Sequence, residues 1–135
     1  MRLRPALIAL VAAVLGLSSR PVLCGSIYVI AHSGTELSQQ DVRDIFLGNK
    51  EFSGEIRLVP VENETVKTEF LDRILGVNRL RYDNIWIKKA FRDAIEPPAA
   101  KRSDSDVTDF VKHTPGAVGY VRNPPGKDVV LIISY

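Results

Sequence analysis

The stretch Thr114-Pro115-Gly116-Ala117-Val118-Gly119-Tyr120-Val121 ends a helix and begins a buried strand. Pro115 cannot continue a helix and Gly116 allows the left-handed backbone at a helix end, so the preceding helix is predicted to stop near His113. The residues that follow predict a strand. Gly119 lies within that strand, and its missing side chain indicates the close approach of another backbone or a helix. Taken alone, the stretch is equally compatible with ordinary helix-to-strand punctuation.

Local signals predict the other helices and strands of the chain. Ser38 can cap a helix ending at Gly48, with Asp41 completing a capping box. A second helix is predicted to start at Asn63 or Thr65 and to end at Gly76, and the next loop is polar. The last strand is almost wholly apolar, which predicts a central position or cover on both faces. The predicted strands are 27–31, 56–61, 117–121 and 128–134. Two further helices are predicted, one from Asn78 to the prolines Pro97 and Pro98 and one from Ser103 or Ser105 to the opening motif. The polar loop between these two helices is predicted at 96–106.

This order of strands and helices predicts an α/β sandwich around a small mixed sheet flanked by helices. Ligands of such sheets favour the loops at the carboxyl ends of strands. Here these loops are 31–35 and 61–68. His32 also ends a strand, and we weigh a place in the site against an exposed turn histidine.

The N-terminus has the pattern of a secretory signal peptide. Arg2 and Arg4 precede an apolar run, 6–17, that is short for a membrane span. We predict cleavage after Cys24, which makes residues 1–24 the signal peptide, residues 25–135 one domain and the periplasm the destination. A lipid anchor on Cys24 is the alternative.

Composition narrows the function further. Removing Arg2, Arg4 and Arg20 from the 18 basic side chains leaves 15 against 16 acidic ones, so charge gives no reason to expect a nucleic-acid partner. Cleavage also removes the only cysteine, which excludes disulfides and cysteine-based metal sites from residues 25–135. No nucleophile motif or phosphate-binding loop is present, so we predict neither an enzyme nor a cofactor.

Two segments together resemble a known family. Leu-Ser-Gln-Gln-Asp-Val-Arg-Asp-Ile-Phe-Leu-Gly at 37–48 and the opening motif, with Phe70 and Trp86 between them, resemble the periplasmic phosphate-binding proteins of ABC transporters. The resemblance covers nearly all of residues 25–135. It implies a periplasmic-binding-protein-like fold, and the length has room for a single lobe of the two that close on the ligand in full-length members.

The resemblance also implies a ligand loop, where the family has a pattern similar to Arg-x-Asp-x-Ser-Gly-Thr. Here Glu62 stands at the Arg position and Lys67 at the Gly position, while Glu64 and Thr68 keep the acid and the threonine. Loss of an arginine fork removes the strongest charge-assisted bonds to phosphate, so we expect weak or absent binding. The candidate ligand-binding residues are Ser33, Gly34, Thr35, Asn63, Thr65, Lys67 and Thr68.

Two functions remain open. One is an exported solute-binding-like protein for phosphate or another small oxyanion. The other is a ligand-free interaction or sensory module that binds a membrane transporter, porin or sensor protein; pairing of two copies is also open. The acids Glu62, Glu64 and Glu69 suggest a divalent cation site, but acids beside a helix start more often complement its dipole, so we predict no metal.

Overall fold

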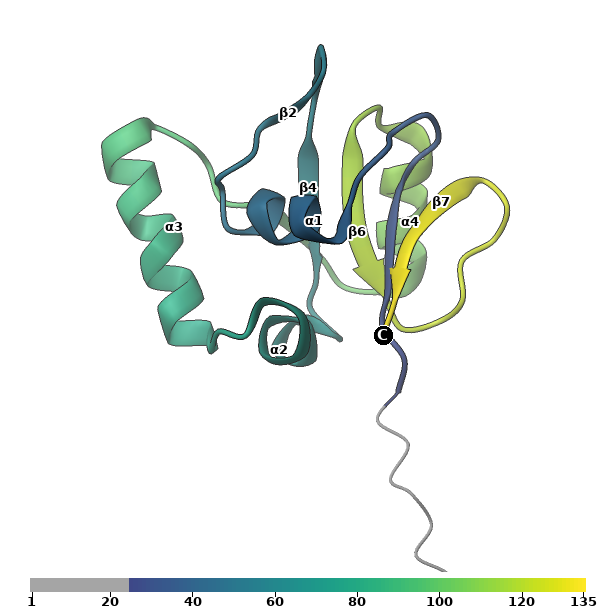
Figure 1. Cartoon of the computed structure of the whole chain (residues 1–135). Coiled ribbons are helices and arrows are strands. Elements are labelled where there is room, and N and C mark those ends of the chain that lie inside the picture. Colours follow the sequence, from purple (N-terminus) through teal and green to yellow (C-terminus); the bar gives the residue numbers. More distant parts are fainter. Residues whose placement is uncertain (1–24) are drawn as a thin grey trace, which may run out of the picture.

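A computed structural model of the chain describes residues 25–135, so the predicted signal peptide, its cleavage site and Cys24 lie outside the described residues. Figure 1 shows a sheet with helices on both sides and one helix, α3, at the margin. No helix within the described range is long and apolar enough to cross a membrane. In chain order the elements are β1 (Tyr28–His32), α1 (Gln39–Phe46), β2 (Phe52–Ser53), β3 (Ile56–Arg57), β4 (Val59–Asn63), α2 (Lys67–Phe70), the π-helix η1 (Leu71–Leu75), α3 (Arg79–Asp93), β5 (Ala99–Lys101), α4 (Asp104–His113), β6 (Ala117–Val121) and β7 (Val129–Ser134).

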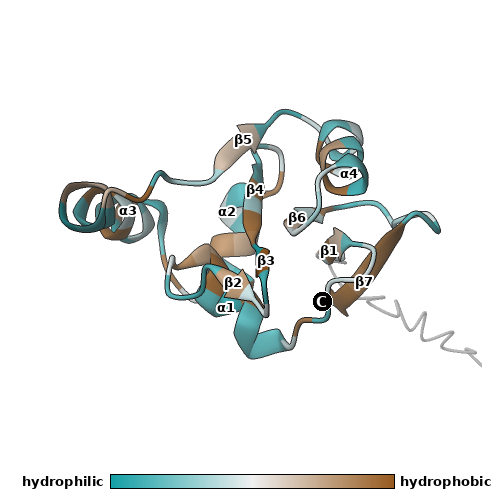
Figure 2. Ribbon diagram, turned by 90° about the horizontal axis from the view of Figure 1, so that it is seen from above, coloured by the Kyte–Doolittle hydropathy of each residue, from teal (hydrophilic) through white to brown (hydrophobic). Residues whose placement is uncertain are grey.

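The main sheet is mixed, and its strand order is β5-β4-β6-β1-β7. Strand β4 runs parallel to β5 and β6, whereas β1 runs antiparallel to both β6 and β7. Seen from above, the five strands follow one another across the molecule (Figure 2). The predicted mixed α/β sandwich is therefore confirmed.

Alternating side chains of the strands divide the core between the two faces of the sheet. Val29 and Tyr120 belong to the cluster shared with α1, η1 and α3, whereas Ile30 and Val121 belong to the cluster shared with α4. On the first face Phe70 stacks on Tyr120 with ring centroids 3.8 Å apart. Both clusters, as far as the structure describes the chain, are made of residues between Ile27 and Tyr135.

Local capping signals positioned three helices as predicted. The Ser38 hydroxyl accepts from the Asp41 backbone N–H, and the Asp41 carboxylate accepts from the Ser38 N–H, which completes the capping box. A hydrogen bond from Lys50, followed by the one from the Ser38 backbone, lowers the pKa of Asp41. Asn78 and Ser103 cap α3 and α4 through their side chains, which accept the backbone N–H groups of Arg81 and Asp106.

The cap predicted for the second helix was wrong. The N-cap residue of α2 is Val66, whose apolar side chain makes no cap hydrogen bond. The side chain of Asn63, one of the two predicted caps, instead bonds to Thr65 within its loop and to Asp104 of α4. Helix α3 ends earlier than predicted, at Asp93, where Ala94 adopts a left-handed conformation before the prolines.

Two strand predictions also needed correction. Within the loop predicted as polar and irregular, β5 pairs with β4 at the rim of the sheet. Strand β7 is the opposite rim rather than a central strand, and Leu131 on it is 47% exposed. Its apolar composition reflects partial packing of Ile132 and Ile133 against the first core cluster.

The two glycines of the opening motif have structural roles. Gly116 has φ +78 and lies against the Arg57 carbonyl, so a side chain there would meet the backbone of β3. At Gly119 an added Cβ would lie 2.6 Å from Val107 Cγ1 of α4 and 2.8 Å from Val61 Cγ1 of β4. The predicted close approach of a helix at Gly119 is confirmed.

We expect Gly119→Ala to lower the free energy of unfolding by about 1–3 kcal/mol, because the methyl group forces α4 away from the sheet. Urea unfolding checks this. Gly126→Ala is the matched control, since no heavy atom lies within 4 Å of a Cβ added there. An equal effect of the two substitutions contradicts the close-packing role of Gly119.

Candidate functional site

The two predicted ligand loops lie at opposite ends of the sheet. Strands β4 and β6 are parallel and end at the same edge, but β1 runs the other way. The loop after β1 therefore sits beside the starts of β4 and β6, away from the loop after β4 (Figure 1). The seven candidate residues do not form one site.

In the loop after β1, Ser33 and Gly34 are exposed and Thr35 is buried. The Thr35 N–H closes a turn on the His32 carbonyl at 3.1 Å, and Gly34 has φ +85. The His32 ring is tied to α4, because its Nδ1 lies 2.9 Å from the Val111 carbonyl oxygen and donates to it. This loop is a turn anchored on α4 rather than a partner of the loop at 63–68.

A nearly buried polar cluster lies at the end of β4. The Glu62 carboxylate receives the Tyr82 hydroxyl at 2.7 Å through one oxygen and the Lys67 ammonium at 2.8 Å through the other. The Glu62 and Lys67 side chains are 6% and 12% exposed. Lys67 Nζ also lies 5.3 Å from the centre of the Tyr82 ring. Lys67 is therefore occupied by an internal carboxylate rather than free on the helix surface.

Tyr82 was not among the predicted site residues. Burial, followed by the charge of Glu62, raises the pKa of its phenol well above the usual range. The hydroxyl therefore stays protonated and serves as a hydrogen-bond donor to Glu62. The sequence signal was only an aromatic residue on the inner face of a helix, which normally indicates core packing.

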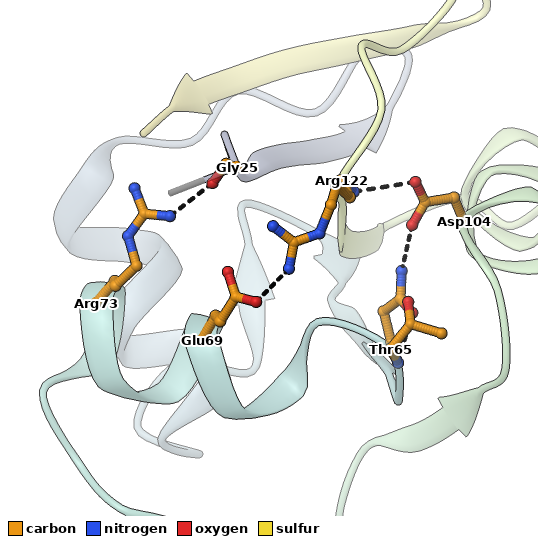
Figure 3. Close-up of polar contacts among 7 residues, drawn as sticks. Gly25, Thr65, Glu69, Arg73, Asp104 and Arg122 are labelled. Carbon is orange, nitrogen blue, oxygen red and sulfur yellow. Dashed lines mark hydrogen bonds and ion pairs between the residues drawn. The ribbon is translucent and has the colours of Figure 1, made fainter. Parts of the chain in front are cut away.

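A second polar network joins the ends of β4 and β6 to α4. The Asn63 amide donates to Asp104 Oδ1 at 2.7 Å, and Asp104 Oδ2 accepts from the backbone N–H groups of Arg122 and Asn123 at 3.0 and 2.9 Å. Asn63 Oδ1 accepts from the Thr65 hydroxyl at 2.7 Å. Figure 3 shows Asp104 between the Arg122 backbone and the loop of Thr65. Asn63 and Thr65 are thus committed to internal bonds.

The acids at 62–69 do not converge on one point. Glu64 pairs with Arg79 and Glu69 with Arg122, while Glu62 faces Lys67. Figure 3 shows the Arg122 guanidinium reaching Glu69. That contact is the first cause of a lowered Glu69 pKa and a raised Arg122 pKa. Within residues 25–135 no group of three or more potential ligands is arranged to hold a metal ion.

Of the predicted loop, Thr68 remains exposed on the first turn of α2. A shallow hollow of about 410 Å³ lies beside this end of the sheet, and Thr65, Asp104 and Arg122 are among its lining residues. It contains a carboxylate that already accepts several N–H groups. Asp104 and Arg122 were missed because neither lies in the aligned loop.

A larger cleft of about 530 Å³ separates α3 from β4 and β5. Its polar end holds the Glu62–Lys67–Tyr82 cluster. Its apolar walls come from α3 and from the chain entering β5, and include Trp86, Ile87, Ala90, Pro97 and Pro98. Trp86 Nε1 donates to the Phe46 carbonyl at 3.1 Å, and the indole is part of the first core cluster.

Comparisons with known proteins give the fold a context. No protein-family model matches the chain, and no curated protein matches its sequence. An ABC-type phosphate transport receptor from Vibrio cholerae aligns with a TM-score of 0.56 and 15% identity, over 80% of this chain and 45% of the receptor. A chain assigned as a phosphate ABC transporter substrate-binding protein from Clostridium perfringens, solved with bound phosphate, aligns with a TM-score of 0.60 at the same identity and coverage.

The chain spans less than half the length of these solved structures. Both are substrate-binding proteins of transport systems rather than enzymes. At this identity the likeness concerns the fold, and it agrees with the resemblance carried by the segments at 37–48 and 114–121. The chain therefore has the α/β fold of phosphate ABC transporter substrate-binding proteins, within less than half of their length.

Proposed function

We propose that this chain is an exported module of the phosphate substrate-binding type that acts in the periplasm through contact with a membrane protein, and not by carrying phosphate. The partner is a transporter, porin or sensor. We infer export from the predicted signal peptide at residues 1–24.

The observation that carries the proposal is the ion pair between Glu62 and Lys67 at 2.8 Å. In the aligned loop, the position that corresponds to the arginine of the family pattern is occupied by Glu62, and Lys67 neutralises the charge of Glu62. A phosphate entering there has to displace a nearly buried carboxylate from its ammonium partner. Charge repulsion and the lost ion pair both oppose phosphate binding.

We expect no thermal stabilisation of residues 25–135 by phosphate, sulfate, arsenate or molybdate. A ligand that binds only the folded state stabilises it by about 2.7 kcal/mol at a hundred times its Kd, so millimolar concentrations reveal binding in the micromolar range. Calorimetric titration provides the second measurement. Micromolar phosphate binding in that titration is the result that overturns the proposal.

Oxyanion capture is the competing function. An oxyanion could bind in the aligned loop or in the hollow beside α4, and a substitution of Thr68 distinguishes these two locations. If an oxyanion binds, Thr68→Val should weaken it about fivefold or more when the ligand lies in the aligned loop, because a hydroxyl donor is lost. Ser105→Ala is the matched control in the hollow beside α4. Unchanged affinity for Thr68→Val removes the aligned loop as the site.

A further inference from the structure

Helix α3 exposes an apolar stripe that the proposed function does not use. Leu80, Ile87 and Phe91 are 71%, 53% and 89% exposed. Their spacing of seven and four residues places them on one face of the helix, along about 16 Å of its axis. The opposite face carries Tyr82 and Trp86, which are buried. Helix α3 also lies at the margin of the molecule in both views (Figures 1 and 2).

Three cations accompany this stripe. Arg81, Lys88 and Arg92 are exposed, and none of them forms an ion pair with any residue in the part of the chain that the structure describes. Leu80 borders a hollow together with Arg81 and Lys88. The apolar and basic side chains therefore share the outward surface of α3.

Of the two acids of α3, Asp93 lines a hollow beside α1, away from this stripe. Asp83 is exposed and lines the cleft toward β5, as Ile87 also does, so it borders the stripe. The outward face of α3, defined here as Leu80, Arg81, Ile87, Lys88, Phe91 and Arg92, consequently holds three apolar and three positive groups, with the single carboxylate of Asp83 at its border.

We propose that the outward face of α3 binds the surface of an anionic lipid bilayer. A helix lying in the interface buries large apolar side chains among the acyl chains and places Lys and Arg against the anionic headgroups. This inference goes beyond the proposed function: it assigns a lipid surface, whereas the function concerns a protein partner. Membrane attachment would hold the module beside such a partner.

Charge and area both favour a bilayer over a second copy of the chain. In an antiparallel twofold contact the same flank of each helix meets itself, so the cations of one copy face those of the other. Stable protein interfaces also use about 20–30 residues on each side, far more than this one stripe. A bilayer needs no complementary groove for a convex helix.

Vesicle flotation tests the proposal, with vesicles of equal parts phosphatidylglycerol and phosphatidylcholine compared with pure phosphatidylcholine. Residues 25–135 are used, because both core clusters lie within them and because the apolar run at 6–17 would itself enter bilayers. We expect binding to the anionic vesicles only, weakening as salt rises.

Variants separate the two contributions. Arg81→Glu with Lys88→Glu should reduce partitioning at least about thirtyfold, because each basic residue near an anionic surface contributes about a factor of five and the new acids are repelled. Leu80→Ser with Phe91→Ser should reduce it about tenfold or more. The matched controls are Arg102→Glu with Lys127→Glu, which reverses two exposed cations elsewhere, and Leu131→Ser on β7.

Three outcomes overturn the proposal: no binding to anionic vesicles, equal loss in the control variants, or concentration-dependent dimerisation that Phe91→Ser abolishes. The last assigns the face to a second copy. Unchanged melting temperatures confirm that the variants remain folded. None of these results depends on the oxyanion titrations, so the two proposals fail separately.

Discussion

Lys67→Met is expected to lower the free energy of unfolding by about 3–5 kcal/mol, because it leaves the Glu62 carboxylate buried without its cation. The two charged groups are 2.8 Å apart, and their side chains are 6% and 12% exposed. Methionine keeps most of the apolar stem of lysine, so the loss reports the charge more than a cavity. Urea unfolding at neutral pH measures it.

Two further substitutions control this result. Lys112→Met breaks a pair of similar length, Lys112 to Asp128 at 3.0 Å, whose side chains are 39% and 67% exposed, and it should change the stability far less than Lys67→Met. Adding Glu62→Gln to Lys67→Met should recover much of the stability, because the amide oxygen still accepts from Tyr82. If Lys67→Met lowers the stability no more than Lys112→Met does, the Glu62–Lys67 ion pair does not hold Lys67 in the way that the proposed function requires.

Phe70→Ala should cost about 3–5 kcal/mol through the cavity that it leaves. Phe70 is fully buried, stacks on Tyr120 and meets the Phe46 ring edge-on at 4.8 Å between centroids. It also joins α2 to η1, so its loss removes the contact that holds this helical segment against β6. Chemical denaturation monitored by circular dichroism gives the change.

Phe91→Ala is the matched control for Phe70→Ala, because the Phe91 side chain is 89% exposed on α3. We expect a change within about 0.5 kcal/mol. Comparable losses from the two phenylalanines contradict the assignment of Phe70 to the centre of the core.

The accuracy of the sequence predictions depended on how local each feature is. Ser38, Asn78 and Ser103 were recognised as caps because a cap bonds to a backbone group three residues away. Strand neighbours depend on distant residues, so the apolar composition of β7 suggested a central strand or one covered on both faces, although β7 lies at the rim and is partly exposed. The same limit concealed β5, whose short sequence forms a strand only by pairing with β4.

The candidate site shows where the expectation that ligands bind at the carboxyl ends of strands stops being useful. That expectation places loops together only when their strands are parallel, and no local signal revealed that β1 runs against β4 and β6. The loop at 62–68 was identified through the family resemblance, and it does carry a polar cluster. Its partners Tyr82 and Arg122 come from α3 and from just beyond β6, which the loop sequence cannot specify.

The position of β1 between β6 and β7 constrains when the chain can fold. Tyr28 pairs with Val121 on one side and with Ser134 on the other, so β1 finds both neighbours only after residues 117–134 have been synthesised. Until then its hydrogen-bonding groups have no sheet to join, and contacts between distant residues form slowly. The sheet order thus leaves the main sheet incomplete until residues 117–134 have joined it.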